Sequence, residues 1–165
     1  MFPRWSVALI IQWRLLLPTA ASHSTRTQQV THDTLLLNLD VPDIAAAERF
    51  YTASFGLRVA RRFGADAVEL RGWAAPLYLL RKPEGTIGAA ADARTYSRHW
   101  TPLHIDVAVD NLDVSLARAA SAGAIIEQPA VRKGYGRIAM LADPFGHGFC
   151  LIEFSASGYD AISAS

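Results

Sequence analysis

Polar and apolar residues alternate along Leu35–Val41, where every second residue is a leucine or valine on one face. This period of two predicts a half-buried strand. Asp43 follows as a helix N-cap, and apolar residues recur at helical spacing over Ile44–Phe55 until Gly56, which predicts a helix ending in a left-handed residue. Short apolar runs then predict three more strands, at Leu57–Phe63, Ala67–Arg71 and Pro76–Leu80.

The same order of elements returns 68 residues after Leu35. Leu103–Val109 alternates again, with Leu103 on its apolar face, and Asn111 is an N-cap for a second helical pattern that Gly123 ends. Three further strands are predicted at Ala124–Glu127, Arg137–Ala142 and Phe149–Phe154. Repetition of a whole βαβββ unit predicts an α+β fold of two half-size modules that bury their sheets together and leave a cleft.

This repeat also predicts the organisation of the chain. The first module is expected over residues 34–81, a Gly/Ala-rich linker over 82–100 and the second module over 101–155, followed by a tail over 156–165. Residues 1–33 are expected to lie outside the fold. Their apolar segment is interrupted by Arg14 and is too short to span a membrane, which favours a cytoplasmic protein over a secreted one. A signal, a tether and a start codon placed too early all stay open for this extension.

Composition narrows the classes of function without naming one. The 165 residues suit one ordinary domain, and 51% hydrophobic residues suffice for a core. Lys and Arg total 16 against 15 Asp and Glu, so there is no strongly basic face for nucleic acid or a membrane surface. Cys150 is the single cysteine, which excludes an intrachain disulfide. Any chemistry must therefore come mainly from His, Asp, Glu, Arg and Tyr.

A set of short motifs carries a family resemblance, which covers Thr34 to about Phe154. These motifs are Asp43 before the first helix, Phe50-Tyr51, Phe55-Gly56-Leu57, His104 on a strand, and Asp143-Pro144-Phe145-Gly146-His147-Gly148 before Glu153. They resemble the vicinal oxygen chelate (VOC) superfamily, which includes glyoxalase I, extradiol dioxygenases, fosfomycin resistance proteins and bleomycin-binding proteins. The resemblance implies an open cup of paired βαβββ modules, commonly in a homodimer, and often a divalent metal that chelates two oxygens of a substrate.

The resemblance also implies where metal ligands would lie, namely early on the first strand of a module and near the end of its last strand. In the second module these positions are His104 and Glu153, which suit Zn, Ni, Fe or Mn, and Glu153 is then also the candidate to shuttle a proton. The repeat places Leu36 and Arg81 at the matching positions of the first module, and neither side chain can bind a metal. Asp106, on the same strand face as His104, is a possible third ligand.

Two interpretations with a small-molecule site therefore stay open, beside a third in which the chain is an assembly partner with a vestigial cup. In the first, the chain is a small-molecule-binding VOC protein of the glyoxalase/bleomycin-resistance type with a degenerate or absent metal site. Arg81 would then pair with Glu153, and the ligand would be bound by Asn38, Asp40, Arg81, Trp100 and Asp106. In the second, it is a lactoylglutathione-lyase-like enzyme, a lyase, isomerase or dioxygenase that uses one divalent metal at His104 and Glu153. Both predict a small-molecule partner and a homodimer, with no nucleic acid or membrane partner, and enzymatic activity is left open.

Overall fold

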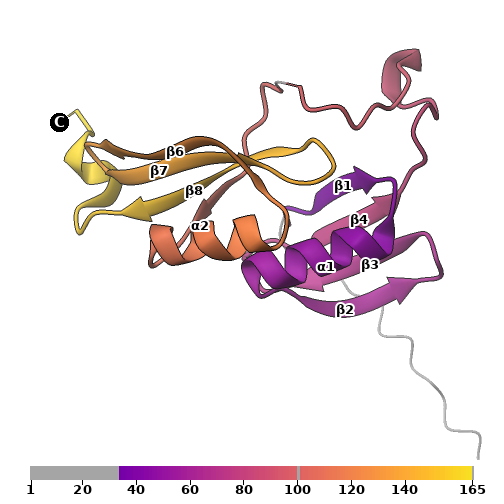
Figure 1. The fold of residues 1–165 in the computed structure, drawn as a ribbon, viewed down its shortest axis with the longest axis horizontal. Helices are drawn as coiled ribbons and strands as arrows, with labels where there is room; N and C mark the ends of the chain where they lie inside the picture. Colours follow the sequence, from indigo (N-terminus) through magenta and orange to yellow (C-terminus); the bar gives the residue numbers. More distant parts are fainter. Residues whose placement is uncertain (1–33, 100, 165) are drawn as a thin grey trace, which may run out of the picture. The chain divides into compact units, whose positions relative to one another are not determined.

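The computed structural model describes residues 34–99 and 101–164, which contain the two predicted modules (Figure 1). The first module comprises β1 (Leu37–Val41), α1 (Ile44–Phe55), β2 (Arg58–Phe63), β3 (Ala67–Arg71) and β4 (Leu77–Arg81). The second comprises β5 (Asp106–Ala108), α2 (Leu112–Ser121), β6 (Ile125–Lys133), β7 (Gly136–Ala142) and β8 (Gly148–Phe154). The α+β fold with two βαβββ units is thus confirmed, while the extension predicted at 1–33 and Trp100 lie outside the described residues.

Each module forms its own four-stranded mixed sheet. The strand orders are β1-β4-β3-β2 and β5-β8-β7-β6, and in each sheet the first and last strands of the module run parallel while the other neighbours are antiparallel. The two sheets share no strand pairing within the described ranges, so they do not close into a barrel.

The caps that the sequence predicts define the helix starts. Asp43 accepts a hydrogen bond from the amide of Ala46 at 3.0 Å, and Asn111 accepts one from the amide of Val114 at 3.0 Å. Gly56 ends α1 with φ of 67°, a conformation that glycine adopts without steric cost. Local sequence chemistry therefore fixes both helices, which each bury one face.

One hydrophobic core joins the two modules, because α1 packs against α2 and each helix covers one face of its own sheet. The largest fully buried apolar side chains come from both halves: Leu70, Leu77, Leu79, Leu112, Leu141, Leu151 and Ile152. We call the face of each sheet that points away from its helix the open face. It is on these open faces that polar groups of the strands are gathered.

Two predicted strand starts are wrong. Leu35 and Leu36 precede β1 and are exposed, and Leu103, expected to point inward, is 73% exposed. The predicted strand over Leu103–Val109 shortens to three residues because β5 pairs with β8 only from Asp106 to Ala108. The residues before β5 belong instead to the long connection between the modules, which includes the short 3-10 helix Ala89–Ala91. No helix in the described ranges is long and apolar enough to cross a membrane.

Candidate functional site

The open face of the second sheet carries a compact group of three possible metal ligands. The parallel register of β5 and β8 places Asp106 directly opposite Cys150, and the next pair, Val107 and Leu151, faces the core. Alternation along a strand therefore turns Asp106 and Cys150 to the open face. There the side chain of His104 joins them, and one donor atom of each of the three lies within 4.8 Å of the others.

The environment of the group favours a protonated thiol. Burial raises the pKa of Cys150 to about 12, and the neighbouring Asp106 carboxylate adds to the effect because a negative charge disfavours a thiolate. Cys150 is buried, whereas His104 and Asp106 are exposed. The group thus presents an imidazole and a carboxylate to solvent above a shielded sulfur.

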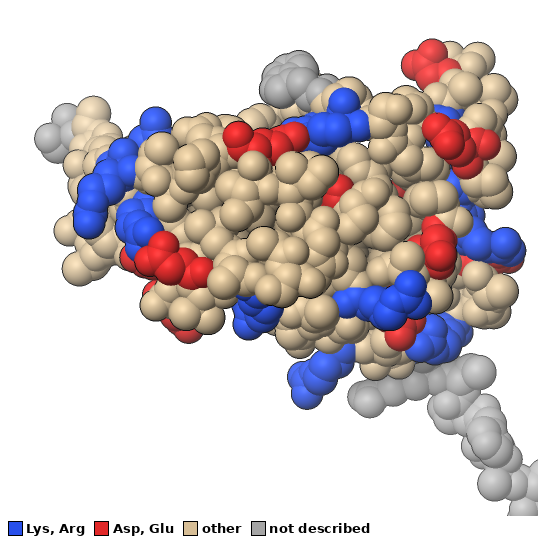
Figure 2. Space-filling model, in the orientation of Figure 1, with Lys and Arg blue, Asp and Glu red and all other residues tan. Residues whose placement is uncertain are grey.

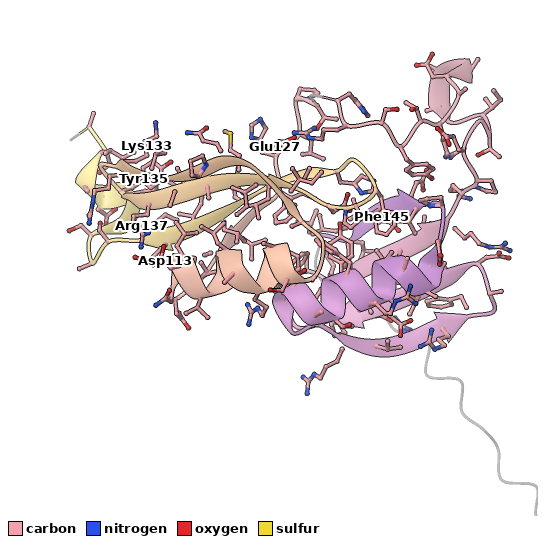
Figure 3. All side chains as sticks on the ribbon, viewed as in Figure 1. Asp113, Glu127, Lys133, Tyr135, Arg137 and Phe145 are labelled. Carbon is pink, nitrogen blue, oxygen red and sulfur yellow. The ribbon has the colours of Figure 1, made fainter. Side chains whose placement is uncertain are left out.

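A pocket of about 100 Å³ lies against this group. Apolar and polar side chains contribute to its wall, which consists of Arg98, Thr101, Leu103, His104, Glu127, Met140, Leu141, Gly148, Phe149 and Cys150. Figure 3 shows Glu127 on the side of the second sheet away from α2, in agreement with its place in this wall. The volume is that of a few water molecules, so it suits the reactive end of a small ligand rather than a large ligand as a whole.

Arg98 is the cation of the pocket, and its position is set by two neighbours. Its Nε donates to Oε1 of Glu127 at 2.6 Å and its Nη2 to Oε2 at 2.9 Å, and this pairing lowers the pKa of Glu127. Gly148 makes room for the guanidinium, since a Cβ atom there would stand 2.6 Å from Nη2. A glycine at the start of β8 thus admits a charged side chain from the connection between the modules.

Glu153, the predicted metal ligand and proton shuttle, lies elsewhere. Its Oε2 accepts a hydrogen bond from the amide of Leu112 at 2.7 Å, at the N-terminus of α2, and lies 3.6 Å from Nη1 of Arg137. It is three residues from Cys150 along β8, so the two side chains point to opposite faces. In Figure 3 Arg137 and Asp113 are likewise on the α2 side. The structure therefore does not bring Glu153 to His104; the carboxylate instead complements the helix dipole of α2.

The predicted ligand-binding residues are divided between the two sheets. Arg81 does not pair with Glu153, because it donates to Asp66, with Nε 2.9 Å from Oδ1. Asp40 accepts a hydrogen bond from Nε of Arg94 at 2.7 Å. Asn38 is exposed on β1, Trp100 is not described, and Asp106 alone of the predicted set joins His104.

The sequence reasoning missed Cys150, Arg98 and Glu127 as site residues. For Cys150 the available signal was the alternation of side chains along a strand. Cys150 and Glu153 are three positions apart, so they point to opposite faces of the sheet. For Arg98 and Glu127 there was no local signal, because they come from the connection and from the start of β6.

Comparison with known proteins shows the family. Residues 36–152 match the family model described as a glyoxalase-like domain, which covers most of the chain. The chain belongs to the glyoxalase-like domain family. This membership confirms the predicted resemblance to the VOC superfamily and to proteins of the glyoxalase type.

Individual relatives agree with this assignment. The proteins named as glyoxylase CFP32 in Mycobacterium tuberculosis and Mycobacterium bovis are 32% identical to this chain over 117 residues. The match covers 69% of this chain and 40% of theirs. The chain thus spans about two fifths of the length of these relatives.

Solved structures show the same fold. A glyoxalase-related enzyme from Fulvimarina pelagi matches with a TM-score of 0.60 and 19% identity over 77% of this chain and 95% of that one. The fosfomycin resistance protein FosX of Listeria monocytogenes, in complex with Mn(II) and a dihydroxypropylphosphonic acid, matches with a TM-score of 0.57 and 14% identity over 78% of this chain and 94% of that one. At these identities the likeness concerns the fold.

Proposed function

We propose that the glyoxalase-like domain binds a small molecule in the pocket of the second sheet, and that His104, Asp106 and Cys150 hold a divalent metal beside it. The observation that carries this proposal is the convergence of three donor atoms within 4.8 Å of one another, two of which belong to residues of the pocket wall, His104 and Cys150. The proposed ligand set therefore differs from the pair of His104 and Glu153. Asp106 comes from β5, Cys150 from the adjacent β8, and His104 from the segment just before β5.

The donor set fits a metal on chemical grounds. A catalytic zinc site has three protein ligands and an open fourth position, with ligand atoms about 2.0–2.3 Å from the ion. Imidazole nitrogen, carboxylate oxygen and thiolate sulfur together suit zinc and its neighbours in the first transition row. A bound metal would polarise an oxygen of the ligand, as the lyase, isomerase or dioxygenase interpretation requires. FosX, a neighbour in fold, binds Mn(II).

The chain's own residues have separate parts in this site. Cys150 must lose its proton when a metal binds, since the thiolate is the ligand form. Arg98 is held by Glu127 and keeps N–H groups at the pocket edge, which would orient an anionic or carbonyl group of the small molecule. Leu103, Met140 and Phe149 supply apolar surface that limits water around it.

Thermal unfolding of the metal-stripped protein with Zn, Co, Ni, Mn or Fe(II) tests the metal. A metal at 100 times its dissociation constant stabilises the native state by about 2.7 kcal/mol, a rise in Tm of roughly 5–11 °C for a domain of this size. Cys150→Ser and His104→Ala are expected to lose the rise, whereas Glu153→Gln, on the opposite face of β8, is the matched control that keeps it. A rise that survives Cys150→Ser but is lost in Glu153→Gln would contradict the proposed ligand set.

A second candidate is metal-free binding of a small molecule in the same pocket. It is favoured by Arg98, which lies in the pocket wall beside its partner Glu127 and keeps N–H groups that can donate to a ligand without a metal. Absence of any metal-dependent rise in Tm, together with binding of benzoate that Arg98→Ala weakens, would support it. Benzoate is chosen because it joins a carboxylate for Arg98 to a flat apolar ring for the wall.

We also propose that the protein is a homodimer. The open faces carry exposed large apolar side chains, among them Phe63, Met140 and Phe154, and such surface in a soluble domain is typical of an interface. Sedimentation velocity of the purified protein would measure the mass directly, and a monomer at micromolar concentration would contradict the proposal.

A further inference from the structure

One buried carboxylate and three arginines share the open face of the first sheet. Glu69 of β3 is opposite Arg61 of β2, and Arg71, two residues further along β3, is opposite Arg58. The neighbours of Glu69 along β3, Val68 and Leu70, are fully buried. Alternation therefore puts Glu69 and the three arginines on the open face, and we call these four residues the arginine cluster. In Figure 2 basic (blue) side chains lie beside β2 in the lower part of the view, with acidic (red) atoms next to them.

Glu69 holds two of the guanidinium groups in place. Arg61 donates through Nε to Oε2 of Glu69, and Arg71 donates through Nε to Oε1. The Glu69 side chain has no exposed surface, whereas those of Arg61 and Arg71 are 51% and 49% exposed. The two guanidiniums thus cover the carboxylate and turn their outer edges to solvent.

Those outer edges retain hydrogen-bond donors. Nη2 of Arg61 lies 3.3 Å from the hydroxyl of Tyr78, and neither Nη atom of Arg71 has a hydrogen-bond partner among the residues that the structure describes. An arginine whose Nε is fixed by a carboxylate presents its remaining N–H groups in a defined direction, which is the geometry that binds an oxyanion.

The charge of the cluster is not balanced within the described part of the chain. Three arginines against one glutamate leave a net charge of about +2. Arg58 forms no ion pair with a described residue, and the residue opposite it is another arginine, Arg71. Like charges at opposite positions of neighbouring strands destabilise a sheet. The nearby carboxylates are already used, since Glu48 pairs with Arg62 and Asp66 with Arg81.

We propose that the arginine cluster binds the dianionic phosphoryl group of a small molecule. A phosphate or phosphonate oxygen set offers three acceptors and a charge near −2, which match the free N–H groups and the excess charge of the cluster. Arg61 and Arg71 would be preorganised by Glu69, and Arg58 would complete the site when the anion neutralises its repulsion from Arg71. This site lies on the first sheet and does not depend on the metal proposed for the second.

Titration of the full chain with inorganic phosphate, followed by thermal unfolding at constant ionic strength in chloride, tests the proposal. Phosphate is expected to raise Tm, and Arg58→Gln is expected to weaken the apparent affinity about tenfold, as loss of one charge-assisted hydrogen bond would. Arg58→Gln leaves the bonds of Glu69 intact, so it avoids an unpaired buried carboxylate. Arg49→Gln is the matched control, because Arg49 is an exposed arginine on α1, away from the open face.

The outcomes separate the alternatives. A Tm that does not rise with phosphate, or an equal loss of affinity in Arg49→Gln, would overturn the site, since the second result means unspecific attraction. Cys150→Ser must leave the phosphate effect unchanged, which keeps this test apart from that of the metal site. A second titration with phenyl phosphate distinguishes the source of the group: tighter binding than inorganic phosphate identifies an organic phosphoryl ligand, and weaker binding identifies free phosphate.

Discussion

Tyr51→Phe is expected to weaken the junction between the modules while leaving its packing in place. The hydroxyl of Tyr51 on α1 donates to Oδ2 of Asp143 at 2.7 Å, and both side chains are buried. The aromatic ring lies among Phe50, Phe55 and Trp73, with centroid distances of 5.0, 5.9 and 6.5 Å. Phenylalanine keeps these contacts, so the substitution removes one buried hydrogen bond to a carboxylate and little else.

The magnitude follows from what Asp143 retains. Its Oδ1 still accepts from the amides of Phe145 and His147 at 2.9 and 2.8 Å, and its Oδ2 stays 2.8 Å from Nδ1 of His147. A hydrogen bond to a charged group contributes about 1.5–3 kcal/mol, and the three remaining partners place the loss at the lower end, about 1.5–2 kcal/mol. Chemical unfolding in urea would measure it as a lower midpoint with an unchanged slope.

A matched variant controls for the loss of a tyrosine hydroxyl in general. Tyr159 is 52% exposed, and its hydroxyl has no hydrogen-bond partner among the described residues, so Tyr159→Phe is expected to cost less than about 0.5 kcal/mol. A loss below that value for Tyr51→Phe would refute the reasoning, because the hydrogen bond to Asp143 would then contribute nothing to the junction.

Three further substitutions test single features. Gly136→Ala would place a Cβ 2.1 Å from the carbonyl oxygen of Glu153, so it should lower the free energy of unfolding in urea by more than about 2 kcal/mol. Gly64 also has a positive φ but has free space around it, so Gly64→Ala should cost only about 1 kcal/mol. Equal losses in the two variants would contradict the clash. Asn111→Ala removes the cap of α2 and should cost about 1 kcal/mol by the same assay, and no loss would contradict its role. Glu69→Gln tests pH dependence: hydrogen bonding to arginine lowers the pKa of Glu69 in the folded state, so its stabilisation is present above about pH 4.3 and is lost as pH falls through the folded pKa. The difference in Tm between wild type and Glu69→Gln should therefore shrink below about pH 4, and a constant difference would contradict it.

The sequence predicted those elements whose chemistry is local. α1 runs over Ile44–Phe55 as predicted, because the Asp43 cap and Gly56 act on their own neighbours. The strand expected over Leu103–Val109 is shorter than predicted, because its length depends on how far β8 extends beside it. An apolar pattern indicates the tendency to form a strand, whereas its ends depend on a partner from another part of the chain.

The candidate site was predictable only in part for the same reason. His104 and Asp106 lie on one face of a short segment, so their proximity follows from alternation alone. Cys150 joins them through the register of β5 against β8, which no local pattern specifies. Glu153 was predicted from its chemistry and its place at the end of a strand, but alternation along β8 sends it to the helix side.

Both proposed sites include residues from matching positions in the two sheets, which we call the open-face row. The register aligns one residue from each strand across the open face of a sheet. In the first sheet the row is Asn38, Tyr78, Glu69 and Arg61, and in the second it is Asp106, Cys150, Met140 and Gln128.

The helix-covered face of each sheet packs into the common core, so substitutions there would open cavities or create clashes. The residues of the open-face row are not part of that common core, so they can differ between the modules without loss of the fold. This explains how one duplicated unit can present an arginine cluster on one sheet and a nitrogen, oxygen and sulfur donor set on the other. It also means that variants of the two sites should act independently, so that a combined Arg58→Gln and Cys150→Ser protein loses phosphate and metal responses by the same amounts as the single variants.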